Sequence, residues 1–213
     1  QNCIFNFDNS SVTGNASFSS GTIDDIKGNI TIGGNVTQSS GTVNINGDMT
    51  VGGNYEMSHT STNKYLYINP GRTLYVKGNF SHYGSTPSYY SNIYVNGSLL
   101  IDGYYDGAYE YHSDVNLYMN SDGSNMEVKG YFKYYPSGKS ANFTKGKIKV
   151  GGTYYNNSTL NGTILLISNL STEPIDIYDP SVSLKGFMGE AEGYYDGSDF
   201  IVDFGNGDIS FTS

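Results

Sequence analysis

Residues 43–55 read VNINGDMTVGGNY, and this stretch carries the pattern that decides the fold. Apolar and polar residues alternate on both sides of an Asn-Gly pair, as they do in two short strands joined by a tight turn. A glycine stands two residues after the second apolar pair, and an aromatic residue stands two further on. The period of two places each apolar pair on one face of a strand. A glycine at a fixed place suits a corner that requires a positive φ.

The second half of this stretch recurs along the chain. Each copy has an alternating apolar pair, a glycine, and a β-branched or aromatic residue, and the glycines are spaced by 19, 25, 25, 27 and 22 residues. Repetition at such a period indicates stacked units that bury their apolar faces against one another. The repeat glycines are Gly34, Gly53, Gly78, Gly103, Gly130 and Gly152, and the residues two positions later are Val36, Tyr55, Phe80, Tyr105, Phe132 and Tyr154.

We therefore predict an all-β protein, a β-solenoid of about six irregular coils of 19–27 residues each. An antiparallel β-sandwich built from hairpins is the alternative, because Asn-Gly pairs between alternating apolar residues favour hairpins. The solenoid is preferred because the motif recurs with the same order of positions, which a sandwich does not require. Residues 23–160 are expected to form the solenoid. Residues 1–22 form a strand-exchanging N-terminal arm, and residues 161–213 a β-rich acidic cap or interaction segment.

Charge is unevenly distributed. Residues 1–150 hold 11 acidic and 10 basic residues, whereas residues 151–213 hold 9 acidic residues and 1 basic residue, for a net charge of −9. Nucleic-acid binding is not expected, because there is no basic face to neutralise phosphates. No run of 18 apolar residues is present, so we expect no membrane span. The first residue, Gln1, fits a secreted chain without its signal peptide, and we expect an extracellular location at the cell surface.

Cys3 is the only cysteine, so a single chain has no internal disulfide. It could form an intermolecular disulfide, carry a modification, or remain a free thiol. Asn-X-Ser/Thr sequons exceed the number expected by chance, which indicates either a glycosylated surface or outward positions rich in Asn, Ser and Thr. The candidate glycosylation sites are Asn9, Asn15, Asn29, Asn35, Asn79, Asn96, Asn142, Asn157, Asn161 and Asn169, with one more sequon at Asn156.

Tyrosine is the most over-used side chain, with 21 residues. On stacked coils, equivalent tyrosines line up as ladders, held by ring stacking and hydroxyl contacts. Such a ladder can pack within the chain, form a subunit interface or bind sugar. The candidate interface ladder is Tyr55, Phe80, Tyr105, Phe132 and Tyr154.

Catalytic, cofactor and metal sites are not predicted. His59, His82 and His112 follow the repeat glycines at unequal distances, so we expect them in surface loops and not in one metal site. Acidic, glycine-containing stretches near the C-terminus resemble calcium-favouring loops, but none has the twelve-residue pattern, and solvated turns explain them as well. No serine lies in a Gly-X-Ser-X-Gly motif. We therefore predict no enzyme and no cofactor.

The quoted stretch, together with residues 74–80 and 126–132, resembles the Gly-Asn-Phe/Tyr repeats of large prokaryotic surface proteins, chiefly from low-GC bacteria. The resemblance covers about residues 25–155 and implies a β-solenoid. It implies little about role, since such repeats are mostly of unassigned function. The composition, rich in Asn, Tyr and Gly, also resembles that of archaeal tubular sheath subunits, which form stacked β-hoops.

The ends of an open β-solenoid expose unpaired strand edges, and this chain has no amphipathic helix to cover them. Either the acidic C-terminal segment caps one end, or the ends pair with other copies. We therefore predict a structural subunit of an extracellular self-assembling polymer, such as a sheath, surface layer or filament, whose partner is itself. A cell-surface adhesin or glycan-binding module is the alternative, with glycans or calcium as partners.

Overall fold

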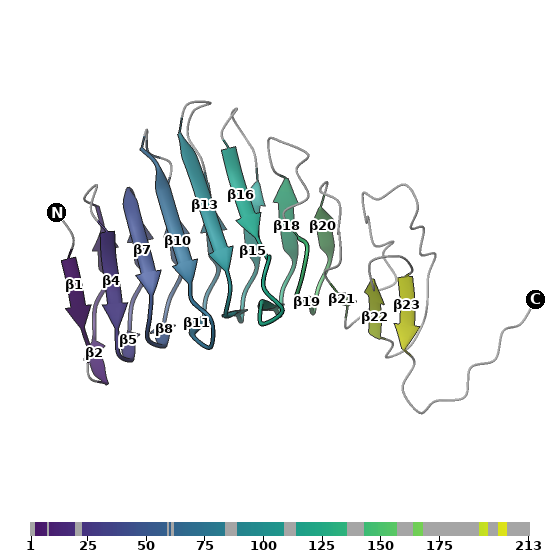
Figure 1. Cartoon of the computed structure of the whole chain (residues 1–213), viewed down its shortest axis with the longest axis horizontal. Helices are drawn as coiled ribbons and strands as arrows, with labels where there is room; N and C mark the ends of the chain where they lie inside the picture. Colours follow the sequence, from purple (N-terminus) through teal and green to yellow (C-terminus); the bar gives the residue numbers. More distant parts are fainter. Residues whose placement is uncertain are drawn as a thin grey trace, which may run out of the picture.

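The structure, a computed structural model, describes residues 3–7, 9–19, 23–58, 60, 62–83, 89–108, 114–135, 143–156, 164–167, 192–195 and 200–203. Every regular element in this part of the chain is a β-strand. The strands form three sheets, and each of the first six turns contributes one strand to each sheet (Figure 1). Within the repeat, neighbouring strands are parallel, which confirms the β-solenoid over the antiparallel sandwich.

Sheet A contains the first strand of each turn, in the spatial order of the sequence. Each strand pairs in parallel with its equivalent in the next turn. Its members are β1 (Cys3–Asn6), β4 (Ile23–Lys27), β7 (Gly41–Ile45), β10 (Lys64–Ile68), β13 (Tyr90–Val95) and β16 (Asp114–Tyr118).

Sheet B contains the second strand of each turn and continues past the last turn. Its strands are parallel from β2 to β21, and an antiparallel pair, β22 and β23, completes it. Its members are β2 (Ser10–Val12), β5 (Ile30–Ile32), β8 (Met49–Val51), β11 (Thr73–Val76), β14 (Ser98–Ile101), β17 (Asn125–Val128), β19 (Lys147–Val150), β21 (Ile164–Ile167), β22 (Glu192–Tyr195) and β23 (Phe200–Asp203).

Sheet C contains the third strand of each turn, and all of its pairings are parallel. Its members are β3 (Ala16–Phe18), β6 (Val36–Gln38), β9 (Tyr55–Met57), β12 (Phe80–His82), β15 (Tyr105–Ala108), β18 (Phe132–Tyr135) and β20 (Tyr154–Asn156).

The core is a continuous column enclosed by the three sheets. Alternate residues of each strand point inward, as in β5, where Ile30 and Ile32 are buried and Thr31 is exposed. Equivalent inward positions stack from turn to turn, so that Ile32 pairs with Val51 and Val51 with Val76. Burying one such aliphatic side chain stabilises the fold by roughly 1.5–3 kcal/mol. Each turn supplies several of them, and only the neighbouring turns cover them.

At both ends of the solenoid, strands pair beyond residues 23–160. Residues 1–22 were expected to form a separate strand-exchanging arm, but β1, β2 and β3 pair in register with β4, β5 and β6 of the same chain. In this register Val12 is opposite Ile32 and continues its inward position. At the other end, sheet B extends beyond residue 160, because β21 pairs in parallel with β19.

The repeat glycines serve close approach and not positive φ. Positive φ occurs at Gly28, Gly41, Gly71 and Gly146, none of which is a repeat glycine. A Cβ atom on Gly53 would instead lie 2.2 Å from the Oδ1 atom of Asn35 in the preceding turn. The glycine therefore leaves room for an asparagine side chain that bridges two turns.

Candidate functional site

The first turn is an open end of the solenoid, because no described strand lies beyond it. β1, β2 and β3 are each the last strand of their sheet (Figure 1). All three residues of β2 are exposed. Val12 is 38% exposed, whereas Ile32 and Val51, its equivalents one and two turns further in, are 2% and 0% exposed. A further turn stacked on β2 would therefore bury an inward apolar position that is now open to water.

The backbone of β2 and β3 has hydrogen-bonding groups directed at this end. The Ser10 N–H donates to the Asn29 carbonyl at 3.1 Å, and the Val12 carbonyl accepts from the Gly33 N–H at 2.7 Å. Successive residues of a parallel strand bond to opposite neighbours, so the N–H and C=O of Ser11 face the free edge.

Ser17 has the same position in β3. Its neighbours Ala16 and Phe18 bond inward, to the Asn35 carbonyl and the Ser39 N–H, both at 2.9 Å. Ser11 and Ser17 therefore each offer one backbone donor and one backbone acceptor to a strand beyond the first turn. Unpaired groups of this kind are a ready template for another chain.

An asparagine ladder runs from this end along the corner between sheets B and C. The Oδ1 atom of Asn15 accepts from the Asn35 backbone N–H at 2.8 Å. The same bond then links Asn35 to Asn54 at 2.8 Å and Asn54 to Asn79 at 2.9 Å. Asn79 Oδ1 accepts from the Tyr104 N–H at 3.1 Å, and in the next two turns Tyr104 and Tyr131 take the place of asparagine. The ladder holds successive turns in register and reaches the free end at Asn15.

Several sequon asparagines belong to such ladders. Asn15, Asn35 and Asn79 use Oδ1 in the ladder just described, while Asn29 donates through Nδ2 to Asn9 Oδ1 at 3.2 Å in a second corner. Asn9, Asn15, Asn29 and Asn35 are exposed, and Asn79 and Asn96 are half-buried. Glycosylation stays a prediction. Asn142, Asn157, Asn161 and Asn169 lie outside the described residues.

The candidate interface ladder is internal, which corrects the prediction. Its five members are fully buried, with 0% exposure, on the inner face of sheet C. Neighbouring rings stack with centroid separations of 4.9, 5.6, 5.0 and 5.1 Å. The residue two positions after each repeat glycine points into the core, so this ladder packs within the chain. The five residues are Tyr55, Phe80, Tyr105, Phe132 and Tyr154.

A different tyrosine ladder lies on the outside of sheet A. Tyr67 stacks on Tyr94 with a centroid separation of 4.5 Å, and Tyr94 on Tyr118 at 4.6 Å, with planes within 6° of parallel. All three side chains are half-buried. Burial raises the pKa of Tyr67, and the neighbouring Tyr94 adds to this shift. The signal in sequence is a tyrosine between two inward apolar residues, as in Ile93-Tyr94-Val95.

A second outer pair, Tyr104 and Tyr131, stacks at 4.6 Å at the corner between sheets B and C. Burial, with Asp106, Tyr104 and Tyr83 as neighbouring groups, raises the pKa of Tyr131 to about 12. In both ladders the rings cover each other's faces, so the surface presents ring edges and hydroxyl groups.

A buried polar cluster lies between sheets C and A, and sequence reasoning missed it. His82 was expected in a surface loop, but it is fully buried in β12. Its Nδ1 atom is 2.9 Å from the Tyr105 hydroxyl, and its Nε2 atom is 2.8 Å from the Ser91 carbonyl. Burial lowers the pKa of His82 to about 3, so the ring is neutral at pH 7. His59 and His112 lie outside the described residues.

Lys64 belongs to the same region and is 1% exposed. Its ammonium group donates to the carbonyls of Thr60 and Thr62 at 3.4 and 3.2 Å and to the Thr60 hydroxyl at 3.3 Å. Burial lowers the pKa of Lys64 to about 8. The Ser91 hydroxyl is also buried and has no hydrogen-bond partner among the described residues. The sheets enclose these groups, and apart from the Ser91 hydroxyl their polar atoms have hydrogen-bond partners within the core.

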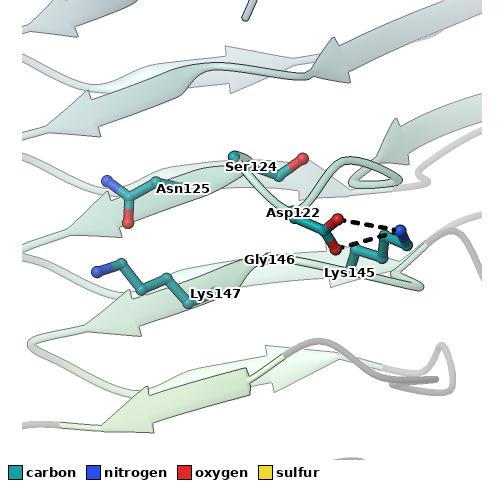
Figure 2. Close-up of a pocket in the computed structure, with 7 residues that line it drawn as sticks. Asp122, Ser124, Asn125, Lys145, Gly146 and Lys147 are labelled. Atoms are coloured by element: carbon teal, nitrogen blue, oxygen red, sulfur yellow. Dashed lines mark hydrogen bonds and ion pairs between the residues drawn. The ribbon is translucent and has the colours of Figure 1, made fainter. Parts of the chain in front are cut away.

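A hollow at the corner between sheets A and B is lined by residues of two successive turns (Figure 2). Asp122 and Lys145 form an ion pair across it, with Nζ 3.2 Å from each carboxylate oxygen. Asn125 and Lys147 lie on its other side, where Lys147 is exposed. The paired charges leave no exposed carboxylate cluster here for acid–base chemistry.

Cys3 is in β1, where its backbone pairs with Asp24 of β4. It is therefore in the first turn, at the same uncovered end as Ser11. No group of three or more His, Cys, Asp or Glu residues in the described part of the chain could hold a metal ion. The acidic, glycine-containing stretches considered for calcium lie mostly outside the described ranges. Among the described residues there is no long apolar helix that could cross a membrane.

Comparisons with protein-family models, with curated proteins and with solved structures give no match. Function is therefore argued from the chain's own residues.

Proposed function

We propose that this protein is a structural subunit of an extracellular self-assembling polymer, in which copies stack end to end through their strand edges. The observation that supports the proposal best is the open first turn. It offers the backbone groups of Ser11 and Ser17 to another strand, and Val12 is 38% exposed at an inward position. A strand of a stacked copy beyond β2 would pair with Ser11 and cover Val12, and a strand beyond β3 would pair with Ser17.

Two further features agree with assembly from a soluble subunit. The net charge of −9 keeps separate copies apart until a partner or a cation screens it. The sequon residues Asn29 and Asn35 are exposed in the second turn, where glycans would lie outside the core. The extracellular location is part of the proposal, as is the absence of a catalytic role.

The proposal is tested by blocking the edge without disturbing the fold. Proline at positions 11 and 17 removes the two N–H groups that face the free end, and proline is tolerated on edge strands. We expect Ser11→Pro/Ser17→Pro to remain monomeric in sedimentation velocity at concentrations where the native protein polymerises. The matched control, Ser11→Thr/Ser17→Thr, keeps both N–H groups and should polymerise. A native protein that stays monomeric at every concentration would contradict the proposal.

Cys3 gives the proposal a second readout. Cys3 is the single cysteine and lies in the first turn, so a disulfide between copies would join two first turns and would mark a head-to-head contact. Polymers that dissolve on addition of reductant would show that Cys3 contributes such a bond, and polymers that persist would leave strand pairing as the main contact. Cys3→Ser separates this effect from any other action of the reductant.

Glycan binding is the second candidate function, and the observation that favours it is the outer ladder of Tyr67, Tyr94 and Tyr118. We rank it lower because sugars stack on ring faces, and these rings cover each other at 4.5–4.6 Å. A glycan array probed with the native protein and with Tyr94→Ala tests it. Binding that is lost in the variant would support an adhesin, and no binding to any glycan would dismiss it.

A further inference from the structure

Sheet B is the sheet that reaches both ends of the described chain. It begins at β2 in the first turn and ends at β23, whereas sheet A ends at β16 and sheet C at β20 (Figure 1). β2 and β23 each have a strand neighbour on one side only. Among the described residues, sheet B therefore has an edge at each end to which no further strand is added.

The two edges run in the same direction. β21 is parallel to β19 and, through the sheet, to β2. β22 is antiparallel to β21, and β23 is antiparallel to β22, so β23 has the direction of β21 again. One antiparallel strand after β21 would give the edge the opposite strand direction. Two antiparallel strands, β22 and β23, bring back the direction of β21.

We infer that β23 of one copy pairs in parallel with β2 of the next, so that sheet B continues without a break through a head-to-tail stack. This inference rests on the proposed function and names its contact. β2 supplies the N–H and C=O of Ser11, which face away from β5. The occupant of the β2 edge is therefore a second copy of this chain, through residues 200–203.

The burial gradient supports this occupant. At the inward position of sheet B, exposure falls from 38% at Val12 to 2% at Ile32, where one strand lies outside it. One strand added beyond β2 would therefore be enough to bury the Val12 side chain. A head-to-head pair, β2 against β2, would also add one strand, but it would leave β23 unpaired and would end growth at a dimer.

Cysteine cross-linking between two populations tests the pairing, in a Cys3→Ser background. One population carries Ser11→Cys, and the other carries Ile201→Cys or, in a separate sample, Val202→Cys, because the register along β23 is to be found. Facing strands bring Cα atoms to about 5 Å, within disulfide range. We expect a disulfide-linked dimer of the two populations after mild oxidation. Thr31→Cys is the matched control. Thr31 is opposite Ser11 in the next strand inward, so a cysteine there should not cross-link.

The outcomes separate this inference from the proposed function. Polymers with the mixed cross-link support both. Polymers in which Ser11→Cys links only to itself would overturn the head-to-tail pairing and leave the polymer intact. Polymers with no cross-link at either β23 position would place the contact elsewhere and also overturn the inference. A failure of the native protein to polymerise at all would overturn the proposed function.

Discussion

At the residue scale, the glycine and asparagine of the Gly-Asn pair in each of the first four turns act together. The asparagine side chain accepts a hydrogen bond from the backbone of the next turn, as Asn35 Oδ1 does from the Asn54 N–H at 2.8 Å. The glycine one residue before Asn54 leaves the space that the Asn35 side chain occupies. The pair therefore occurs where two turns must approach closely and hold register.

Gly53→Ala should destabilise the fold for this reason. Its Cβ would lie 2.2 Å from Asn35 Oδ1 and 3.1 Å from the Gly34 carbonyl carbon, so the ladder has to shift. We expect a loss of about 2 kcal/mol, typical of a forced overlap in a packed site. Urea unfolding of dilute protein measures it.

Gly14→Ala is the matched control. Gly14 is the equivalent residue of the first turn, and nothing lies within 4 Å of a Cβ placed there. Its unfolding midpoint should stay close to that of the native protein. Equal losses for the two variants would show that the glycines act through backbone freedom and not through space for the ladder.

Neutral His82 makes stability depend on pH. Its pKa is about 3 in the folded chain and about 6.5 when unfolded, so the unfolded chain binds more protons between these values. The contribution of neutral His82 to the free energy of unfolding is complete above pH 6.5 and is lost as the pH falls towards 3. Over this range the free energy of unfolding changes by up to about 1.4 kcal/mol per pH unit.

Urea titrations between pH 4 and pH 7 measure this slope. His82→Met introduces the residue found at the equivalent position of the preceding turn, Met57, and removes the titrating group. The pH dependence of its unfolding free energy should be weaker than that of the native protein by the contribution of the histidine. An unchanged slope in His82→Met would assign the pH dependence to other groups.

At the scale of elements, the buried aromatic stack is the main internal contact of sheet C. Phe80 lies between Tyr55 and Tyr105, with centroids 4.9 and 5.6 Å away, and is fully buried. A void at this position would remove contacts in two neighbouring turns at once. We expect Phe80→Ala to cost about 3–5 kcal/mol in chemical unfolding.

Tyr90→Ala serves as the comparison, because Tyr90 is 46% exposed and at the start of β13. Its loss should be within about 0.5 kcal/mol. A similar loss in both variants would mean that the stack adds nothing beyond surface aromatic contacts.

The alternation of apolar residues predicted most of these elements correctly. Met49 and Val51 point inward, as the period of two requires, and their equivalents stack in every turn. The number of sheets could not be predicted, because a period of two does not tell how many corners a coil has. The sequence therefore did not show which face of the strand after each glycine points inward. Tyr55 was named as a candidate interface residue, but its side chain is buried in the core.

Polar residues at inward positions were hidden from sequence reasoning for a related reason. His82 and Gln38 occupy the same inward ladder as Met57. They are buried because partners distant in sequence satisfy them: Gln38 Nε2 donates to the Tyr65 carbonyl at 3.0 Å, 27 residues away. Such partners are visible only once the turns are stacked. The free edge, in contrast, follows from the open architecture that the sequence predicted.

At the scale of the whole molecule, the solenoid is a stack of turns, and its first turn is open to the addition of a further strand layer. Each internal turn covers its neighbour, and the first turn has no described neighbour on its outer side. Assembly would extend the same contacts that fold the chain: parallel strand pairing, and burial of the position that Val12 leaves open. Subunit and polymer would then share one axis, with strands across it.

Cryo-electron microscopy of the native protein at high concentration tests this most directly. The account predicts filaments or tubes in which strands lie across the direction of stacking and repeat every 4.7–4.9 Å along it, with the first turn of each copy against the end of another. A field of single short rods at every concentration, or assemblies joined through the flanks of the sheets with the first turn left open, would contradict it.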